Sequence, residues 1–293
     1  MRLGLIGNGP WGRNIERTLR SFDDVSLTRI TRGMEAPAAL DGVLVATPGH
    51  THADVALPYI EKGIATFIEK PVATSVADAE RIRRAAVLSG SLVFGGHTDL
   101  YNPAFRRALD AMSALGAIRN LLFEGMNNRP LPETSVLWEW LPHQLAATRI
   151  IFDADPTHVT AWDLSTDRHL GAAVTRYDFA SASVVSMVSW QSPIKKRRLT
   201  ITCERGGLVF DDTMTAKLVA YRDGQEPSLL EYGNELPLTL ELRAFVDAVV
   251  AGNNDRSQLD AIVSITCAIA AAERSASDGG ATVALADFML PPA

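Results

Sequence analysis

The chain has 293 residues, of which 47% are hydrophobic and 21% are charged, a balance typical of folded globular proteins. Its formal net charge of −6 argues against a nucleic-acid or anionic-membrane partner, because no basic field would collect phosphate groups. Two cysteines, Cys203 and Cys267, are too few for a disulfide framework and fit a reducing compartment.

The N-terminus lacks the pattern of a signal peptide, since Met1-Arg2 leads directly into a predicted strand. No run of about eighteen apolar residues occurs, so no membrane span is predicted. We therefore expect a cytoplasmic protein.

The first third of the chain alternates short apolar runs with helical patterns, which is typical of βαβ units and a doubly wound parallel sheet. The predicted strands are Arg2–Ile6, Val25–Ile30, Gly42–Thr47, Ala65–Ile68 and Ser91–Gly95. Helices are predicted from Pro10, from Thr51 to Lys62 and from Ser75 to Ser89. The segment Thr31–Asp41 is too short for a full crossover helix.

The pattern changes after Gly96. A connecting helix is predicted over Pro103–Leu115, followed by strand-like runs whose spacing favours an antiparallel sheet. Helices are predicted over His143–Phe152, Leu238–Ala251 and Ser257–Ser277. We predict an α/β protein with a parallel-sheet domain over residues 1–115. An α+β domain with a large, mostly antiparallel open sheet is predicted over residues 116–293, for substrate binding and oligomerisation.

A glycine-rich loop follows the first strand and opens the first helix, which is the context of a Rossmann dinucleotide-binding fingerprint. Gly7 permits the tight turn, Gly9 lets a pyrophosphate approach the backbone, and Gly12 lets the helix pack closely on the strand. The alternative is a turn without a ligand. The residues assigned to cofactor binding here are Gly7, Asn8, Gly9, Pro10, Trp11 and Gly12.

The end of the second strand carries Thr31-Arg32-Gly33, where NAD-binding proteins normally place an acid for the ribose hydroxyls. A guanidinium at Arg32 could pair with a 2′-phosphate instead, which favours NADP modestly over NAD. The alternative is that Arg32 is a solvated surface charge.

The third strand ends in a loop at the carboxyl edge of the sheet, where ligands bind in such folds. Its candidate cofactor contacts are Thr47, Pro48, His50 and His52. We predict no metal site, because the acidic and cysteine ligands that would complete one are absent beside the two histidines.

The fourth strand ends in Glu69-Lys70-Pro71. An ammonium group at this strand end can stabilise an alkoxide or transfer a proton beside a bound nucleotide. Glu69 can hold the lysine in place, and we assign both residues to the cofactor site. The alternative for Lys70 is an ordinary surface lysine.

These motifs resemble the Gfo/Idh/MocA oxidoreductases, a family that includes glucose-fructose oxidoreductase and inositol dehydrogenase. The resemblance rests on the glycine loop, Thr47-Pro48 with His52, Glu69-Lys70-Pro71 and His143. Further segments resemble a branch that acts on sugar nucleotides and related sugars. They are Gly96-His97-Thr98, Tyr101-Asn102-Pro103, Leu137-Trp138-Glu139, Pro142-His143 and Ser189-Trp190 with Pro193, Lys195 and Arg197.

The resemblance implies that Lys70 and His143 form the catalytic pair, with Glu139 where many relatives have an aspartate. A histidine has a pKa suited to general acid–base catalysis of alcohol oxidation. We expect Pro142 to start the helix, which would leave Glu139 in the preceding turn. Ala146 replaces an acid that many relatives keep.

Polar residues predicted near strand ends of the second domain suit a hydroxyl-rich ligand. The candidate substrate contacts are His97, Tyr101, Asn102, Arg129, Trp138 and His143, with Asn127, Asn128 and Trp140 nearby. The tryptophans could instead be packing residues. The run Lys195-Lys196-Arg197-Arg198 could meet a diphosphate or carboxylate, or be a solvated strand whose alternation divides the four residues between two faces.

The predicted function is NAD(P)-dependent hydride transfer to or from a sugar, polyol or sugar nucleotide. Three alternatives use the same fold: an NAD-dependent glycosidase, a biliverdin-reductase-like enzyme, and a non-catalytic cofactor sensor. The open sheet predicts a homodimer or homotetramer.

Overall fold

The structure is a computed structural model that describes residues 1–31, 34, 39–128, 134–165, 170–253 and 255–289. The chain divides into two compact units. The first comprises Met1–Tyr101 and Glu235–Thr266, and the second comprises Asn102–Asn234 and Cys267–Leu290.

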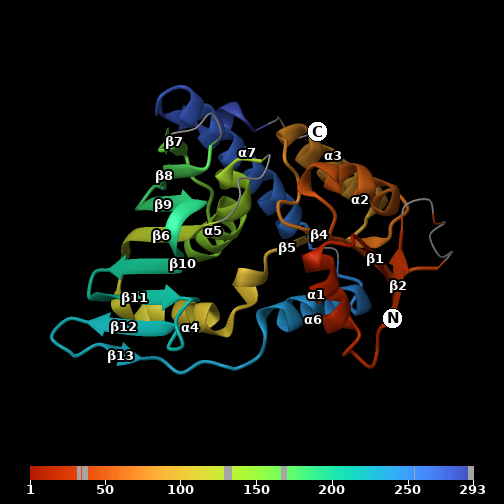
Figure 1. Cartoon of the computed structure of the whole chain (residues 1–293), viewed down its shortest axis with the longest axis horizontal. Coiled ribbons are helices and arrows are strands. Elements are labelled where there is room, and N and C mark those ends of the chain that lie inside the picture. Colours follow the sequence, from red (N-terminus) through yellow and green to blue (C-terminus); the bar gives the residue numbers. More distant parts are fainter. Residues whose placement is uncertain (32–33, 35–38, 129–133, 166–169, 254, 290–293) are drawn as a thin grey trace. The chain divides into compact units, whose positions relative to one another are not determined.

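A five-stranded parallel sheet forms the centre of the first unit, with the strand order β2-β1-β3-β4-β5 (Figure 1). Its strands are β1 (Arg2–Ile6), β2 (Ser26–Ile30), β3 (Gly42–Val45), β4 (Ala65–Glu69) and β5 (Val93–Gly96). Its helices are α1 (Pro10–Leu19), α2 (His52–Ile60), α3 (Val76–Ser89) and α6 (Pro237–Val250), with the 3₁₀ turns η1 (Gly49–Thr51) and η2 (Thr98–Tyr101). The helix α2 packs against α3 and α1 packs against α6, on opposite sides of the sheet (Figure 1). The predicted doubly wound parallel sheet is confirmed.

The core of the first unit is built around aromatic rings from two strands and one distant helix. Phe67 of β4 and Phe94 of β5 stack at 5.7 Å, and Phe245 of α6 meets each of them edge-on at 5.7 Å. All three side chains are buried. This packing holds α6 in the first unit although it lies more than 130 residues after β5 in the sequence.

The division of the chain differs from the expected boundary after residue 115. Residues 102–115 belong to the second unit, because Phe105 of α4 (Pro103–Met112) packs against Phe210 of that unit's sheet. Residues 235–266 belong to the first unit because of the aromatic packing of α6. A single boundary along the sequence cannot describe this division, because the chain comes back to the first unit at residue 235.

A nine-stranded sheet dominates the second unit, in the order β13-β12-β11-β10-β6-β9-β8-β7-β14 (Figure 1). Only the β6–β9 pairing is parallel among the described residues, so the predicted mostly antiparallel sheet is confirmed. The strands are β6 (Ile118–Asn128), β7 (His158–Asp163), β8 (Ala172–Asp178), β9 (Ser183–Ser189), β10 (Gln191–Cys203), β11 (Gly206–Asp211), β12 (Leu218–Arg222), β13 (Ser228–Leu229) and β14 (Val283–Ala284). The further elements are α5 (Val136–Phe152), α7 (Ser257–Ser277), which runs across the division between units, and the 3₁₀ turns η3 (Ser113–Leu115) and η4 (Leu285–Asp287).

The two faces of this sheet differ. Helices α4 and α5 cover one face, where Leu121, Phe123 and Leu199 are buried. The other face presents large apolar side chains to solvent: Leu122 is 37% exposed, Met187 is 40% exposed and Trp162 is 43% exposed. Because side chains alternate along a strand, this uncovered face is continuous across the central strands.

Among the described residues, no helix combines the length and apolar character needed to cross a membrane.

Candidate functional site

The glycine loop between β1 and α1 has the geometry of an open cradle. Gly7 has φ +122°, and a Cβ there would lie 2.2 Å from the carbonyl oxygen of Ala46. A Cβ on Gly12 would lie 2.5 Å from the carbonyl oxygen of Gly7, whereas a Cβ on Gly9 would meet nothing within 4 Å. The outer two glycines are therefore required by the fold, and the middle one leaves space for a ligand.

The first turn of α1 can receive an anion. Gly9 is its N-cap residue and makes no side-chain capping bond, and Pro10 follows at the first helical position. Uncapped N–H groups at the positive end of a helix bind phosphate. The cradle and this turn together fit the pyrophosphate of a dinucleotide.

Two arginines stabilise the glycine loop, and neither was predicted as a site residue. Arg29 of β2 donates from Nη2 to the carbonyl oxygen of Gly7 at 3.1 Å and pairs with Glu16 of α1 at 3.3 Å. Arg13 donates to the carbonyl oxygen of Asn8 at 2.9 Å. The sequence alone does not show this contact, because it depends on how the residues of β2 pair with those of β1.

A side-chain hydrogen bond joins the glycine loop to the end of β4. Trp11, which is 41% exposed, donates from Nε1 to Oε1 of the buried Glu69. The other oxygen of Glu69 accepts from the backbone N–H of Lys70 at 3.2 Å. Trp11 and Glu69 were both predicted at the cofactor site, and the structure brings them together with Lys70, whose side chain is half-buried.

A second buried carboxyl group lies beside the first. Glu241 of α6 is wholly buried and accepts from Oγ1 of Thr98 at 2.6 Å. Burial raises the pKa of Glu69 to about 7, against the opposing influences of Trp11 and Lys70. Burial, and then the neighbouring Glu69 carboxyl, raise the pKa of Glu241 as well. Two adjacent buried carboxyls disfavour double ionisation, so the pair retains a proton more readily than exposed glutamates.

His52 connects the end of β3 to the Lys70-Pro71 turn. Its Nδ1 lies 2.8 Å from the carbonyl oxygen of Pro71, and its Nε2 lies 2.8 Å from that of Thr47. Burial lowers its pKa despite these two carbonyls. The backbone engages both ring nitrogens, so His52 braces the site, whereas Pro48 and His50 are exposed on the same loop.

The predicted start of the α5 helix is wrong. The helix begins at Val136, with Pro142 in its interior, rather than at Pro142. Glu139 therefore lies one helical turn before His143, and the two share a side of the helix. Both are half-buried, whereas Trp138, Leu141 and Pro142 are buried. Packing of these apolar neighbours favours continuing the helix through the proline.

The remaining candidate residues have varied surroundings. Tyr101 stacks on Phe94 at 6.3 Å, and Trp138 is buried. Asn102 is buried, where it caps α4 through the N–H of Ala104 and donates to Asp212. His97 is half-buried, and its ring lies against Gly95. Arg32 and Arg129 lie outside the described residues.

The run Lys195–Arg198 is divided as strand alternation predicts. Lys196 Nζ lies 2.6 Å and Arg198 Nε lies 3.8 Å from the carboxylate of Glu124 on the uncovered face of the sheet. Arg197 lies on the helix-covered face, where its guanidinium carbon is 5.7 Å from the ring centroid of Trp140.

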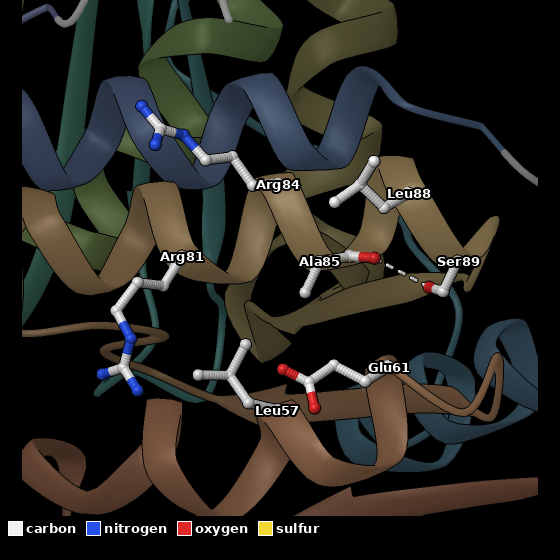
Figure 2. A pocket seen from close by; sticks show the side chains of 7 residues that line it. All are labelled: Leu57, Glu61, Arg81, Arg84, Ala85, Leu88 and Ser89. Atoms are coloured by element: carbon white, nitrogen blue, oxygen red, sulfur yellow. Dashed lines mark hydrogen bonds between the residues drawn. The ribbon is translucent and has the colours of Figure 1, made fainter.

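A hollow of about 440 Å³ lies elsewhere, between α2 and α3 (Figure 2). It is lined by Leu57, Glu61, Arg81, Arg84, Ala85, Leu88 and Ser89. Arg81 is already paired with Asp54 and Asp78, and none of the predicted site residues lines this hollow. Across the part of the chain that the structure describes, no group of three or more potential ligands could hold a metal ion.

Comparison with known proteins agrees with the cradle geometry. Residues 3–97 match the family described as "Oxidoreductase family, NAD-binding Rossmann fold". Inositol 2-dehydrogenase 3 of Saccharopolyspora erythraea is 31% identical over 159 residues, which are 46% of this chain and 47% of that protein. The matched part thus spans about half the length of that curated relative.

Solved structures resemble nearly the whole chain. An oxidoreductase from Magnetospirillum magnetotacticum is 26% identical, with a TM-score of 0.81 over 92% of this chain and 99% of that chain. An inositol dehydrogenase homologue from Azotobacter vinelandii, complexed with NADH and myo-inositol, is 16% identical. Its TM-score is 0.83 over 97% of each chain, which shows a shared fold.

Proposed function

We propose that the chain is a member of the Gfo/Idh/MocA oxidoreductases and an NAD(P)-dependent dehydrogenase acting on CH–OH groups. One observation carries the proposal. The Trp11–Glu69 hydrogen bond connects the dinucleotide cradle to the strand end that bears Lys70. The strand end that bears Lys70 is thereby connected to the cofactor loop, and an ammonium group there suits alkoxide stabilisation.

The cofactor is held by the glycine loop, with its pyrophosphate on the first turn of α1. The bound nicotinamide supplies the acceptor or donor of hydride. Arg32 favours a 2′-phosphate and hence NADP. Measured KM values for NAD and NADP test this choice, and a clear NAD preference would remove the role of Arg32.

Lys70 and His143 handle the proton in this mechanism. The imidazole of His143 takes the hydroxyl proton as the carbinol carbon loses hydride, and returns it in the reverse direction. The ammonium of Lys70 stabilises the developing alkoxide. Glu139 lies one helical turn before His143 on α5 and orients the imidazole.

The substrate is a polyol or sugar. This class follows from the inositol dehydrogenases among the relatives and from the polar candidate contacts His97 and Arg129. The sides of the substrate site include Tyr101, Asn102 and Trp138. Stacking on Phe94 positions Tyr101, capping of α4 positions Asn102, and burial positions Trp138.

The test is a substrate screen. The protein is incubated with NAD⁺ or NADP⁺ and a panel of inositols, sugars and sugar nucleotides, and the absorbance of reduced cofactor is followed. We expect turnover of at least one CH–OH substrate. Cofactor binding without turnover of any panel member would favour the cofactor sensor, and sugar release without net reduced cofactor would favour the glycosidase.

We also propose that two copies of the chain associate through the uncovered face of the nine-stranded sheet. Leu122, Met187 and Trp162 form exposed apolar surface there, and Glu124 with Lys196 and Arg198 supplies both signs of charge for a self-complementary contact.

A further inference from the structure

Arg197 differs from the other cations of its strand in its surroundings. It faces Gly125 of β6 in the β6–β10 register, on the side of the sheet that α5 covers. Its guanidinium carbon lies 5.7 Å from the centre of the Trp140 ring, within cation–π range. Its side chain is nevertheless 47% exposed, so the charged end is open to a ligand.

The platform under Arg197 is built into the fold. Trp140 is buried, and a Cβ on Gly125 would lie 2.7 Å from its ring, so only a glycine lets the indole lie on the strand. A Cβ on Gly125 would also lie 3.1 Å from Nε2 of Gln144, one turn further along α5. The indole therefore lies between α5 and β6.

The charge of Arg197 is weakly compensated. Its Nη1 lies 4.0 Å from the carboxylate of Asp212. That carboxylate already accepts from Lys217 Nζ at 2.7 Å and from Asn102 Nδ2 at 3.1 Å. By contrast, Lys196 and Arg198 on the opposite face share Glu124.

Polar atoms with unused hydrogen-bonding capacity belong to Trp140 and to residues near it in α5 and β6. Trp140 Nε1 and Gln144 Oε1 are buried and have no hydrogen-bond partner within the described part of the chain. Asn127 Oδ1, two residues after Gly125 and on the same side of β6, is in the same situation. Buried polar groups of this kind are normally satisfied by water or by a ligand.

The platform belongs to the helix that carries the proposed acid–base residue. Trp140 follows Glu139 directly and precedes His143 by three residues, so Trp140 and His143 are neighbours on the surface of α5. Trp140 therefore neighbours both His143 along the helix and Arg197 across its ring.

We propose that Arg197 on its Trp140 platform is a specificity-determining residue that binds the carboxylate or phosphate of an anionic polyhydroxylated substrate. This inference rests on the proposed function and narrows its substrate class. A planar guanidinium binds carboxylate and phosphate oxygens through two parallel hydrogen bonds. Hydroxyl groups of the ligand, directly or through a water, use the polar atoms of Asn127, Trp140 and Gln144.

The experiment compares three ligand types on the intact protein: a neutral polyol such as myo-inositol, a carboxylate such as glucuronate, and a phosphate ester such as glucose 6-phosphate. We expect the wild type to have a kcat/KM at least about tenfold higher for one of the anionic ligands than for the neutral one. The favoured anion distinguishes carboxylate from phosphate. R197M should raise the KM of that ligand about 10- to 100-fold, the range for a charged hydrogen bond, with little change in kcat or in the neutral substrate's KM.

R198M is the matched control, since Arg198 is the adjacent arginine on the opposite face of β10. It should leave the ratio of anionic to neutral KM at the wild-type value. R197K, which keeps the charge and loses the planar fork, should fall between wild type and R197M. An equal effect of R197M on neutral and anionic ligands, or the same ratio change in R198M, would overturn the proposal, as would a wild-type preference for neutral substrates.

A second measurement separates this inference from the proposed function. If the wild type turns over no panel member, the dehydrogenase assignment fails, and ligand-induced thermal stabilisation then tests Arg197 alone. The anionic ligand should raise the melting temperature of the wild type and R198M, but not of R197M. No stabilisation of the wild type by either anion would refute the subsite.

Discussion

The two units hold their candidate functional residues by different means. In the first unit, main-chain groups hold the candidate residues in place. These groups are the turn at Gly7, the two carbonyls that contact His52 and the N–H of Lys70, which binds Glu69. In the second unit, the positions of Glu139, Trp140 and His143 are set by the rotation of α5 about its axis. The packing of Trp140 on Gly125 determines that rotation. The first site is thus held largely by main-chain groups at the strand ends, and the second by the packing of one helix on the sheet.

The largest expected effect concerns the proposed proton-handling residues Lys70 and His143. K70A and H143A should each lower kcat by at least about a hundredfold, because each removes a proton-handling or alkoxide-stabilising group. Cofactor affinity, measured by fluorescence titration, should change little in H143A. Near-full activity in both variants would end the proton-transfer assignment.

The buried carboxyl pair makes the stability of the first unit depend on pH. The folded state raises the pKa of Glu69 from 4.5 to about 7, so it retains a proton that the unfolded chain releases. Stability should therefore fall as the pH rises from about 4.5 to about 7 and then level off. The loss over this window is on the order of a few kcal/mol.

E69Q should flatten this dependence, because glutamine keeps an acceptor for Trp11 and cannot ionise. Denaturant unfolding at several pH values measures the slope, and E241Q tests the second carboxyl. E61Q, at an exposed glutamate, is the control and should keep the wild-type slope. An unchanged slope in both E69Q and E241Q would show that the pair does not carry the effect.

The glycine loop allows fold and ligand effects to be separated. G7A should lower the free energy of unfolding by about 1–3 kcal/mol, because its backbone has φ +122° and its Cβ would meet Ala46. G9A should leave that free energy within about 0.5 kcal/mol of the wild type, since its Cβ meets nothing, yet weaken cofactor binding at least about tenfold. Normal cofactor affinity in G9A would contradict the pyrophosphate assignment.

The contrast between the units also explains what could be predicted from the sequence. The tight turn at Gly7 and the close packing at Gly12 could be predicted, because they follow from the local geometry of a strand–loop–helix connection. The division of Lys196 and Arg197 between two faces followed from strand alternation.

Tertiary packing explains what the sequence left hidden. The start of α5 was mispredicted because a proline ends most helices, whereas buried neighbours hold Pro142 inside this one. Glu241 was not predicted because its place beside Glu69 depends on the return of α6 to the first unit. No local pattern encodes such a return.

The smallest expected effect concerns the uncovered sheet face of the second unit. L122E and M187E place charges on two apolar side chains that are 37% and 40% exposed, so the fold of a single copy should tolerate them. If copies pair through this face, each charge would be desolvated in the contact and should shift the protein toward monomer. Light scattering at micromolar concentration measures the mass. I150E, at an exposed residue of α5 on the helix side of the sheet, is the control and should leave the mass unchanged. A monomeric wild type would contradict the pairing, and so would variants that keep the wild-type mass.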